Sequence, residues 1–172
     1  MRMLTVVDYD ENWPALFENE CSLLQMMPGK VISKIHHMGS TSVPGLAAKP
    51  VIDILIEVTS LDELDSLNNA LEHIGYTVRG ENGISNRRYF TKGGNQRSHH
   101  LHAFAIGDAQ IIKHLAFRDY LIKNKEVAAQ YASIKKAAML LCENDNHRYN
   151  TFKADFIQKH LRLALIDAGY MD

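Results

Sequence analysis

The sequence predicts an α+β fold: a mixed β-sheet of four or five strands with an N-terminal helix and a helical C-terminal third. Three observations lead to this class. Residues 51–58 are almost all β-branched or leucine, which is typical of a strand buried on both faces. Short strand-like segments separated by glycine- and asparagine-rich turns continue to residue 106. From residue 108 onward, apolar residues recur at helical spacing.

Each element has a local signal. Residues 13–27 carry apolar side chains near helical spacing, Pro14 suits a first turn, and Pro28 with Gly29 ends the segment. Ser60 and Glu63 form a capping box at the start of a second helix. Strands are expected over 31–37, 50–58, 76–78, 87–91 and 99–106, and helices over 13–27, 60–74, 108–123, 125–143 and 150–168.

Length and composition indicate one domain. The 172 residues show no internal repeat and no long linker, so we expect a single domain over 1–172, with a sheet core over 1–107 and a packed helical tail over 108–172. Hydrophobic residues make up 46% and charged residues 23%, which excludes a disordered chain. A formal net charge of -1 excludes a protein that binds polyanions over its whole surface, although local basic patches remain open.

The sequence favours a cytoplasmic protein of bacterial type without a membrane partner. No segment reaches the roughly 18 apolar residues of a membrane span, and the N-terminus lacks the pattern of a signal peptide. Cys21 and Cys142 lie in apolar helical stretches, so we expect free, buried thiols in a reducing compartment.

The strongest indication of a binding site is the segment 36–42, His-His-Met-Gly-Ser-Thr-Ser. Gly39 lets backbone N–H groups approach a ligand, and the hydroxyls of Ser40, Thr41 and Ser42 add donors. Such a turn can hold a phosphate group. The alternative is a structural turn whose hydroxyls cap neighbouring backbone groups.

Residues 43–49, which follow this turn, could contribute to a phosphate site. Residues 43–48 could supply one helical turn with Pro44 at its first position, and Lys49 could neutralise a bound anion. The segment is not a P-loop, because Gly39 and Gly45 are one residue too far apart and Lys49 does not follow Gly45 directly.

Asp53 interrupts the apolar run of its strand, and an unpaired buried carboxylate is costly. We expect it beside the Gly-Ser turn, at the open end of the strand. One compensating partner is Mg²⁺ bound to a phosphate. The other is an ion pair with Lys49 or with an arginine of the basic window 79–97.

The histidines of the last predicted strand allow two interpretations. His100 and His102 alternate onto one strand face, and with Asp53 they would form a metal site of two imidazoles and one carboxylate. The alternative, which the frequency of His-x-His in ordinary sheets favours, is a polar sheet face lining a cleft.

The basic window 79–97 contains five basic residues against one acid, Glu81. Arg87 and Arg88 within it could bind phosphate or carboxylate if they border the Gly-Ser turn. The window could equally be a solvated hairpin edge. Few aromatic residues interleave with these charges, which disfavours nucleic acid as a partner. We expect Lys135 in an ion pair on a helix surface.

A resemblance to the GrpB-like family covers essentially the whole chain. It rests on 35–54, Ile-His-His-Met-Gly-Ser-Thr-Ser-Val-Pro-Gly-Leu-Ala-Ala-Lys-Pro-Val-Ile-Asp-Ile, and on 117–121, Phe-Arg-Asp-Tyr-Leu. The strand 97–102 and the tyrosine–lysine spacings of the helical tail are also similar. The resemblance implies a nucleotidyltransferase-like fold of the polymerase-β type, and it gives Arg118 and Lys153 a place in the cleft.

The same resemblance implies a Gly-Ser turn that holds nucleotide phosphates, an Asp-x-Asp pair that binds Mg²⁺, and a third carboxylate on a later strand. Asp53 matches the first acid, but Leu55 stands at the second. Glu57 shares the face of Asp53 but lies two residues beyond position 55, about 6.7 Å further along the strand than the expected second acid, which is a poor match for the same ion. The later strand offers His100 and His102 in place of the third acid.

The sequence therefore predicts a nucleotidyltransferase-like protein that binds a nucleotide or another small anion in a cleft. In its catalytic version Asp53 ligates Mg²⁺, His100 or His102 completes the site, and the arginines balance the phosphate charge. In its non-catalytic version, which Leu55 favours, the cleft binds the ligand without turnover. A metal-dependent hydrolase that uses the histidines is a third hypothesis. The sequence leaves the oligomeric state open.

Overall fold

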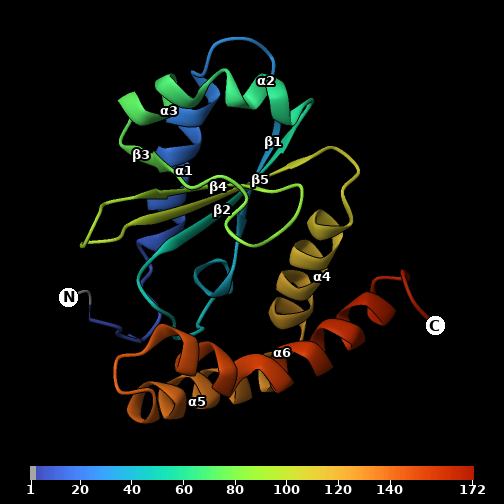
Figure 1. Ribbon diagram of the computed structural model, residues 1–172. Coiled ribbons are helices and arrows are strands. Elements are labelled where there is room, and N and C mark those ends of the chain that lie inside the picture. Colours follow the sequence, from blue (N-terminus) through green and yellow to red (C-terminus); the bar gives the residue numbers. More distant parts are fainter. Residues whose placement is uncertain (1–2) are drawn as a thin grey trace.

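A computed structural model describes residues 3–172, so residues 1 and 2 of the expected single domain lie outside the described part. Five strands form one mixed sheet in the order β1-β2-β5-β4-β3 (Figure 1). The strands are β1 Ile32–Met38, β2 Ile52–Val58, β3 Tyr76–Val78, β4 Arg88–Lys92 and β5 His99–Ala105. The helices are α1 Trp13–Gln25, the 3₁₀ turn η1 Ser40–Ser42, α2 Leu61–Asp65, α3 Asn68–His73, α4 Ala109–Lys123, α5 Lys125–Leu141 and α6 Asn146–Asp167. These elements confirm the predicted α+β class.

Strand β2 lies between β1 and β5 in the sheet. It pairs antiparallel with β1 and parallel with β5. Every residue of β2 except Asp53 is buried, which explains why its sequence does not alternate. The parallel register sets Asp53 beside His100 and Leu55 beside His102. Because residues two apart in a strand share a face, all four side chains lie on one side of the sheet.

The two faces of the sheet are covered differently (Figure 1). Helices α1, α2 and α3 cover one face, where the largest apolar cluster includes Trp13, Ile54 and Leu101. On the other face, a smaller cluster of Met38, Leu55, Phe104 and Ile111 packs against α4. The polar side chains of β2 and β5 continue from this second cluster toward the end of the sheet.

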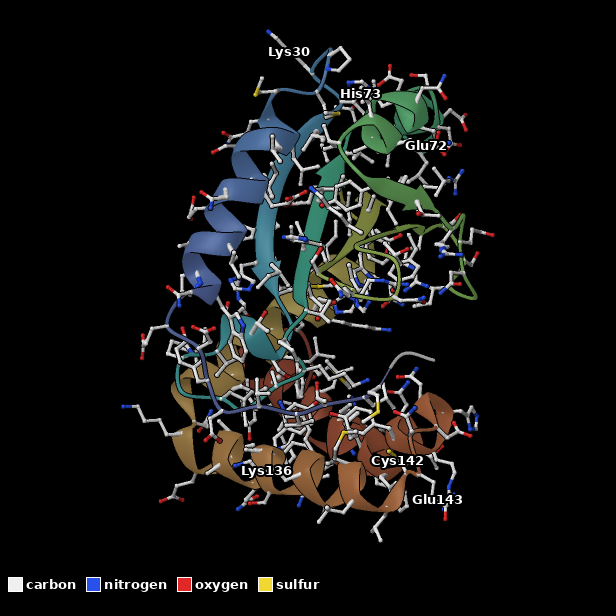
Figure 2. All side chains as sticks on the ribbon, turned by 90° about the vertical axis from the view of Figure 1, so that its left-hand side faces the viewer. Lys30, Glu72, His73, Lys136, Cys142 and Glu143 are labelled. Atoms are coloured by element: carbon white, nitrogen blue, oxygen red, sulfur yellow. The ribbon has the colours of Figure 1, made fainter. Side chains whose placement is uncertain are left out.

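Helices α5 and α6 lie beyond that end of the sheet, at the bottom of Figure 1, and α4 stands upright between them and the sheet; Figure 2 shows the same helical layer from the side. Val43 and Leu46, from the loop after β1, pack against Leu121 and Tyr131 of this layer. The loop that leads from η1 to β2 is therefore held between the sheet and the helices. Both cysteines are free; Cys142 is buried, as expected, but Cys21 is only partly buried. Across residues 3–172, none of the helices has both the length and the apolar character needed to cross a bilayer.

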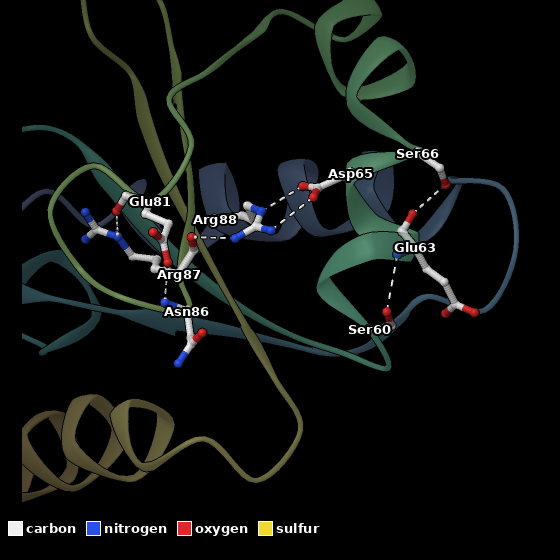
Figure 3. Close-up of polar contacts among 8 residues, drawn as sticks. All are labelled: Ser60, Glu63, Asp65, Ser66, Glu81, Asn86, Arg87 and Arg88. Atoms are coloured by element: carbon white, nitrogen blue, oxygen red, sulfur yellow. Dashed lines mark hydrogen bonds and ion pairs between the residues drawn. The ribbon is translucent and has the colours of Figure 1, made fainter.

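Two local expectations were wrong. The helix expected over 60–74 is broken into α2 and α3, because the Ser66 hydroxyl donates to the Glu63 carbonyl where α2 ends (Figure 3). Helix α6 starts earlier than residue 150, because Asp145 accepts hydrogen bonds from the next backbone N–H groups. Residues 43–48 could have supplied a helical turn, but the helical turn of this loop is the 3₁₀ segment Ser40–Ser42.

The N-cap half of the predicted capping box is confirmed, because the Glu63 N–H donates to Ser60 Oγ at 3.3 Å, while the Glu63 carboxylate accepts from Thr59 Oγ1 at 2.8 Å. We expect Ser60→Ala to lower the free energy of unfolding by about 1 kcal/mol, since it removes the acceptor of an otherwise unpaired helix N–H. Urea denaturation measures this loss. Ser66→Ala is the control, because it removes only a donor to an exposed carbonyl, and we expect a change within about 0.5 kcal/mol. Equal losses in both variants would contradict a capping role for Ser60.

Candidate functional site

A cavity of about 160 Å³ lies where the end of the sheet meets the helical layer. Its walls come from the loop between β1 and β2, from the starts of β2 and β5, and from α5 and α6. The lining residues are Ser40, Thr41, Ala48, Lys49, Val51, Asp53, His100, Lys135, Tyr149 and Lys153. The structure thus brings together the Gly-Ser turn, Asp53, Lys49, Lys153 and one of the two predicted histidines.

Gly39 packs directly on Asp53. Its φ of 71° and ψ of -173° fall in a region that side chains with a Cβ rarely adopt. A Cβ at this position would lie 2.8 Å from Oδ2 of Asp53. Glycine therefore allows the turn and the carboxylate to sit against each other, as the sequence predicted.

The hydroxyls of the turn have different roles. Ser42 Oγ donates to the Gly39 carbonyl at 2.5 Å, and Thr41 Oγ1 lies 2.9 Å from His37 Nε2. These two hydroxyls stabilise the turn itself, which is the structural alternative that the sequence allowed. Ser40 and Thr41 line the cavity, whereas Ser42 and Gly39 do not.

Asp53 pairs with two imidazoles. Its Oδ1 lies 3.1 Å from Nδ1 of His100 and 3.5 Å from Nε2 of His102. Burial acts to raise the pKa of Asp53, but the two neighbouring imidazoles outweigh burial and hold the pKa below its usual value. The carboxylate is therefore ionised at neutral pH. The sequence offered Mg²⁺, Lys49 or an arginine as compensating partners of this carboxylate, and it placed the two histidines beside Asp53 only as a candidate metal site.

Three lysine ammonium groups surround the cavity. Nζ of Lys49 and Nζ of Lys153 lie 4.1 Å and 4.3 Å from the ring centre of Tyr149, and Nζ of Lys135 lies 4.6 Å from that of Tyr131. Burial, reinforced by the neighbouring ammonium groups, lowers the pKa of Lys135 to about 7 and that of Lys153 to about 8. Among the described residues that line the cavity, Asp53 is the one carboxylate.

Lys135 corrects a sequence-based expectation. We expected it in an ion pair on a helix surface, but its side chain is 2% exposed and its ammonium group donates to the Ala47 carbonyl. A signal was present in the sequence, because Lys135 and Lys153 each follow a tyrosine by four residues in a helix. That spacing places an ammonium group over the ring one turn earlier.

The predicted arginines lie outside the lining of the cavity. Arg87 is buried and donates to the Glu81 carbonyl at 3.1 Å (Figure 3). It also donates to the Asn82 carbonyl at 2.8 Å, so it fixes the loop before β4. Arg88 forms a two-pronged ion pair with Asp65, at 2.7 Å and 3.0 Å. These two arginines of the basic window therefore bind the protein's own chain.

Arg118 also contacts protein rather than the cavity. Its Nη1 donates to the His37 carbonyl at 3.1 Å, and its Nε donates to the Asp119 carboxylate at 2.8 Å. It links α4 to the end of β1. His37 itself stacks on Phe17, with ring centres 4.8 Å apart, and burial lowers its pKa to about 4.

The side chains at this site do not fit the Mg²⁺ pair that the resemblance implies. Leu55 occupies the position of the second acid and is fully buried beside His102. Mg²⁺ prefers oxygen ligands in octahedral geometry, whereas the group gathered here is one carboxylate and two imidazoles.

Comparison with known proteins gives consistent matches over most of the chain. A protein-family model described as "GrpB protein" matches residues 3–163. The chain is 41% identical to YqkA of Bacillus subtilis over 91% of its own length, but it spans only 46% of that relative. It is 35% identical to the glutamate-rich protein GrpB of Alkalihalophilus pseudofirmus, covering 91% of this chain and 92% of that one. The crystal structure of the conserved protein GrpB from Enterococcus faecalis superimposes with a TM-score of 0.91 at 39% identity, over 95% of this chain and 99% of that one.

Proposed function

The chain belongs to the GrpB family, and from this premise we propose that it binds a nucleotide or another small phosphorylated anion in the cavity between the sheet and the helical layer. One observation carries the proposal: the ammonium groups of Lys49, Lys135 and Lys153 surround a space that Asp53 alone cannot neutralise. Burial and mutual repulsion lower the pKa of Lys135 and Lys153, so the cavity lining disfavours their ammonium forms. A bound phosphate group would stabilise those ammonium forms by its negative charge.

The remaining lining suits the same ligand. The Ser40 side chain lines the cavity and offers a hydroxyl to a ligand. The ammonium groups of Lys49 and Lys153 lie over the ring of Tyr149. Lysine binds phosphate as a compact charge with three donors. The phosphate part of the ligand fills the cavity, and any sugar or base extends out of it.

We favour binding without nucleotidyl transfer. The transfer reaction needs several oxygen ligands to hold its metal ions against the phosphates. Leu55 supplies none, and the face of β5 that continues the site carries imidazoles. The arginines that were to balance the phosphate charge in the catalytic version are bonded within the protein.

Isothermal titration with ATP, ADP and pyrophosphate tests the binding, with adenosine as the ligand that lacks phosphate. We expect the three phosphate compounds to bind and adenosine to give no heat. Lys153→Ala should weaken binding at least tenfold, because it removes one of the three charges at the phosphate. Lys159→Ala is the matched control on the exposed side of the same helix and should bind like the unchanged protein. Binding that is equal in both variants would exclude the cavity as the site.

A second measurement separates the two versions of the function. Each nucleoside triphosphate is incubated with the protein and either Mg²⁺ or Mn²⁺, and pyrophosphate release is followed. We expect no release above the rate without protein. Release that is lost in Asp53→Asn would establish the catalytic version instead.

A further inference from the structure

We propose that Asp53, His100 and His102 bind a divalent transition-metal ion of the Zn²⁺, Mn²⁺ or Fe²⁺ type. The site adjoins the lysine-lined cavity but does not depend on what that cavity binds. The backbone positions all three ligands, because β2 and β5 pair in parallel with Asp53 beside His100 and with His102 two residues further on the same face.

The distances between ligand atoms are close to those of a metal site. One ligand atom from each of the three residues lies within 4.8 Å of the other two. Oδ1 of Asp53 is 3.1 Å from Nδ1 of His100 and 3.5 Å from Nε2 of His102. In a tetrahedral site with ligands about 2.0–2.1 Å from the ion, ligand atoms are about 3.3 Å apart. The two imidazole nitrogens lie within 4.8 Å of each other, so rotation of the rings toward each other would bring all three ligand atoms to one ion.

His102 gives a second, independent indication. Its Nε2 is buried and makes no hydrogen bond within residues 3–172, although it lies 3.5 Å from the Asp53 carboxylate. Buried polar atoms in folded proteins nearly always have a partner, and one without a partner destabilises the fold. A metal ion between Nε2 and Oδ1 would give this nitrogen the partner that it lacks.

The donor set decides the kind of ion. Two imidazoles and one carboxylate are typical ligands of Zn²⁺, Fe²⁺ and related ions, whereas Mg²⁺ and Ca²⁺ select oxygen. Asp53 and His100 line the cavity. The coordination positions left open by three protein ligands therefore face the cavity, where water or an oxygen of a bound anion completes the shell.

The outer nitrogens of the two imidazoles face guanidinium groups. Nη1 of Arg97 lies 3.5 Å from Nε2 of His100, and Nη1 of Arg87 lies 3.5 Å from Nδ1 of His102. Both separations are at the long limit of a hydrogen bond, so they are weak. Metal binding places the ring proton of each histidine on its outer nitrogen, so that these two weak contacts are lost.

Titration of the full-length protein with metal alone tests the proposal, after the protein has been stripped with EDTA and in a buffer without phosphate. We expect one Zn²⁺ per chain by calorimetry and by elemental analysis, and we expect Co²⁺ to give visible absorption of a site with nitrogen ligands. A tenfold excess of Mg²⁺ should not displace Zn²⁺. Failure to bind Zn²⁺ at one per chain would overturn the proposal.

Variants locate the ion. Asp53→Asn and His100→Gln should each weaken Zn²⁺ binding at least tenfold, with folding checked by circular dichroism. His73→Ala removes an exposed histidine far from the site and should change nothing. Lys153→Ala should keep metal binding while losing the phosphate compounds, so failure of the metal site and failure of the anion site give different results. Zn²⁺ binding that survives in both ligand variants would place the ion elsewhere and overturn the assignment.

Discussion

Gly39→Ala is expected to lower the free energy of unfolding by about 3 kcal/mol and to abolish phosphate binding. Two effects combine at this position. The backbone has a conformation that a residue with a Cβ rarely adopts, and the new methyl group would lie 2.8 Å from Oδ2 of Asp53. The turn must therefore move away from β2, which opens the wall of the cavity. Urea denaturation and titration with pyrophosphate measure the two consequences.

Gly45→Ala is the matched control for this variant. Gly45 has a similar φ of 79°, but a Cβ there would meet no atom within 4 Å. We expect the free energy of unfolding of Gly45→Ala to fall by about 1 kcal/mol, which is the backbone strain alone, and we expect this variant to keep phosphate binding. The difference between the two variants measures the contact of the turn with Asp53. If both variants lost the same amount, that contact would contribute nothing to stability or to the site.

The convergence of Gly39 and Asp53 was predictable because it is nearly local. Strands β1 and β2 are antiparallel neighbours; the glycine and the small residues stand in the connection between them, and the interrupted apolar run is β2 itself. A carboxylate in an apolar strand must have a partner near the strand end. The sequence offered His100 as one of several neighbours of Asp53 and could not choose among them, because His100 is 47 residues away and its position depends on the parallel register of β2 and β5.

The partners of the positively charged side chains were also not predictable from the sequence. The sequence places Arg87, Arg88 and Arg118 in basic or family-like segments, but each is bonded to carbonyls or carboxylates whose proximity depends on packing. From the sequence, Lys135 is expected on the exposed surface of an amphipathic helix, because charged side chains are rarely buried. Only the packing of α5 and α6 on the loop after β1 brings it into the cavity, beside Lys153.

Lys135→Met is expected to change how stability depends on pH. Burial lowers the pKa of Lys135 to about 7 in the folded protein, whereas an unfolded lysine titrates near 10.5. Between these values the unfolded chain binds more protons than the folded chain, so the stability of the unchanged protein rises with pH. Without ligand, we expect its free energy of unfolding to gain about 1–3 kcal/mol over that of Lys135→Met between pH 7 and pH 9.5. Urea denaturation at the two pH values measures this gain.

Lys136→Met is the control, because Lys136 is exposed on the same helix and pairs with Asp8 at 3.1 Å. Its stability should follow that of the unchanged protein at both pH values.

The protonation of Lys135 should also affect ligand binding, since a phosphate group binds the ammonium form of Lys135. Pyrophosphate affinity should therefore fall as pH rises from 7 to 9, and binding at pH 8 should take up protons from the buffer. Because the pKa of Lys153, about 8, also lies in this range, an affinity that stays constant would mean that neither Lys135 nor Lys153 binds the anion, and it would contradict the proposed site.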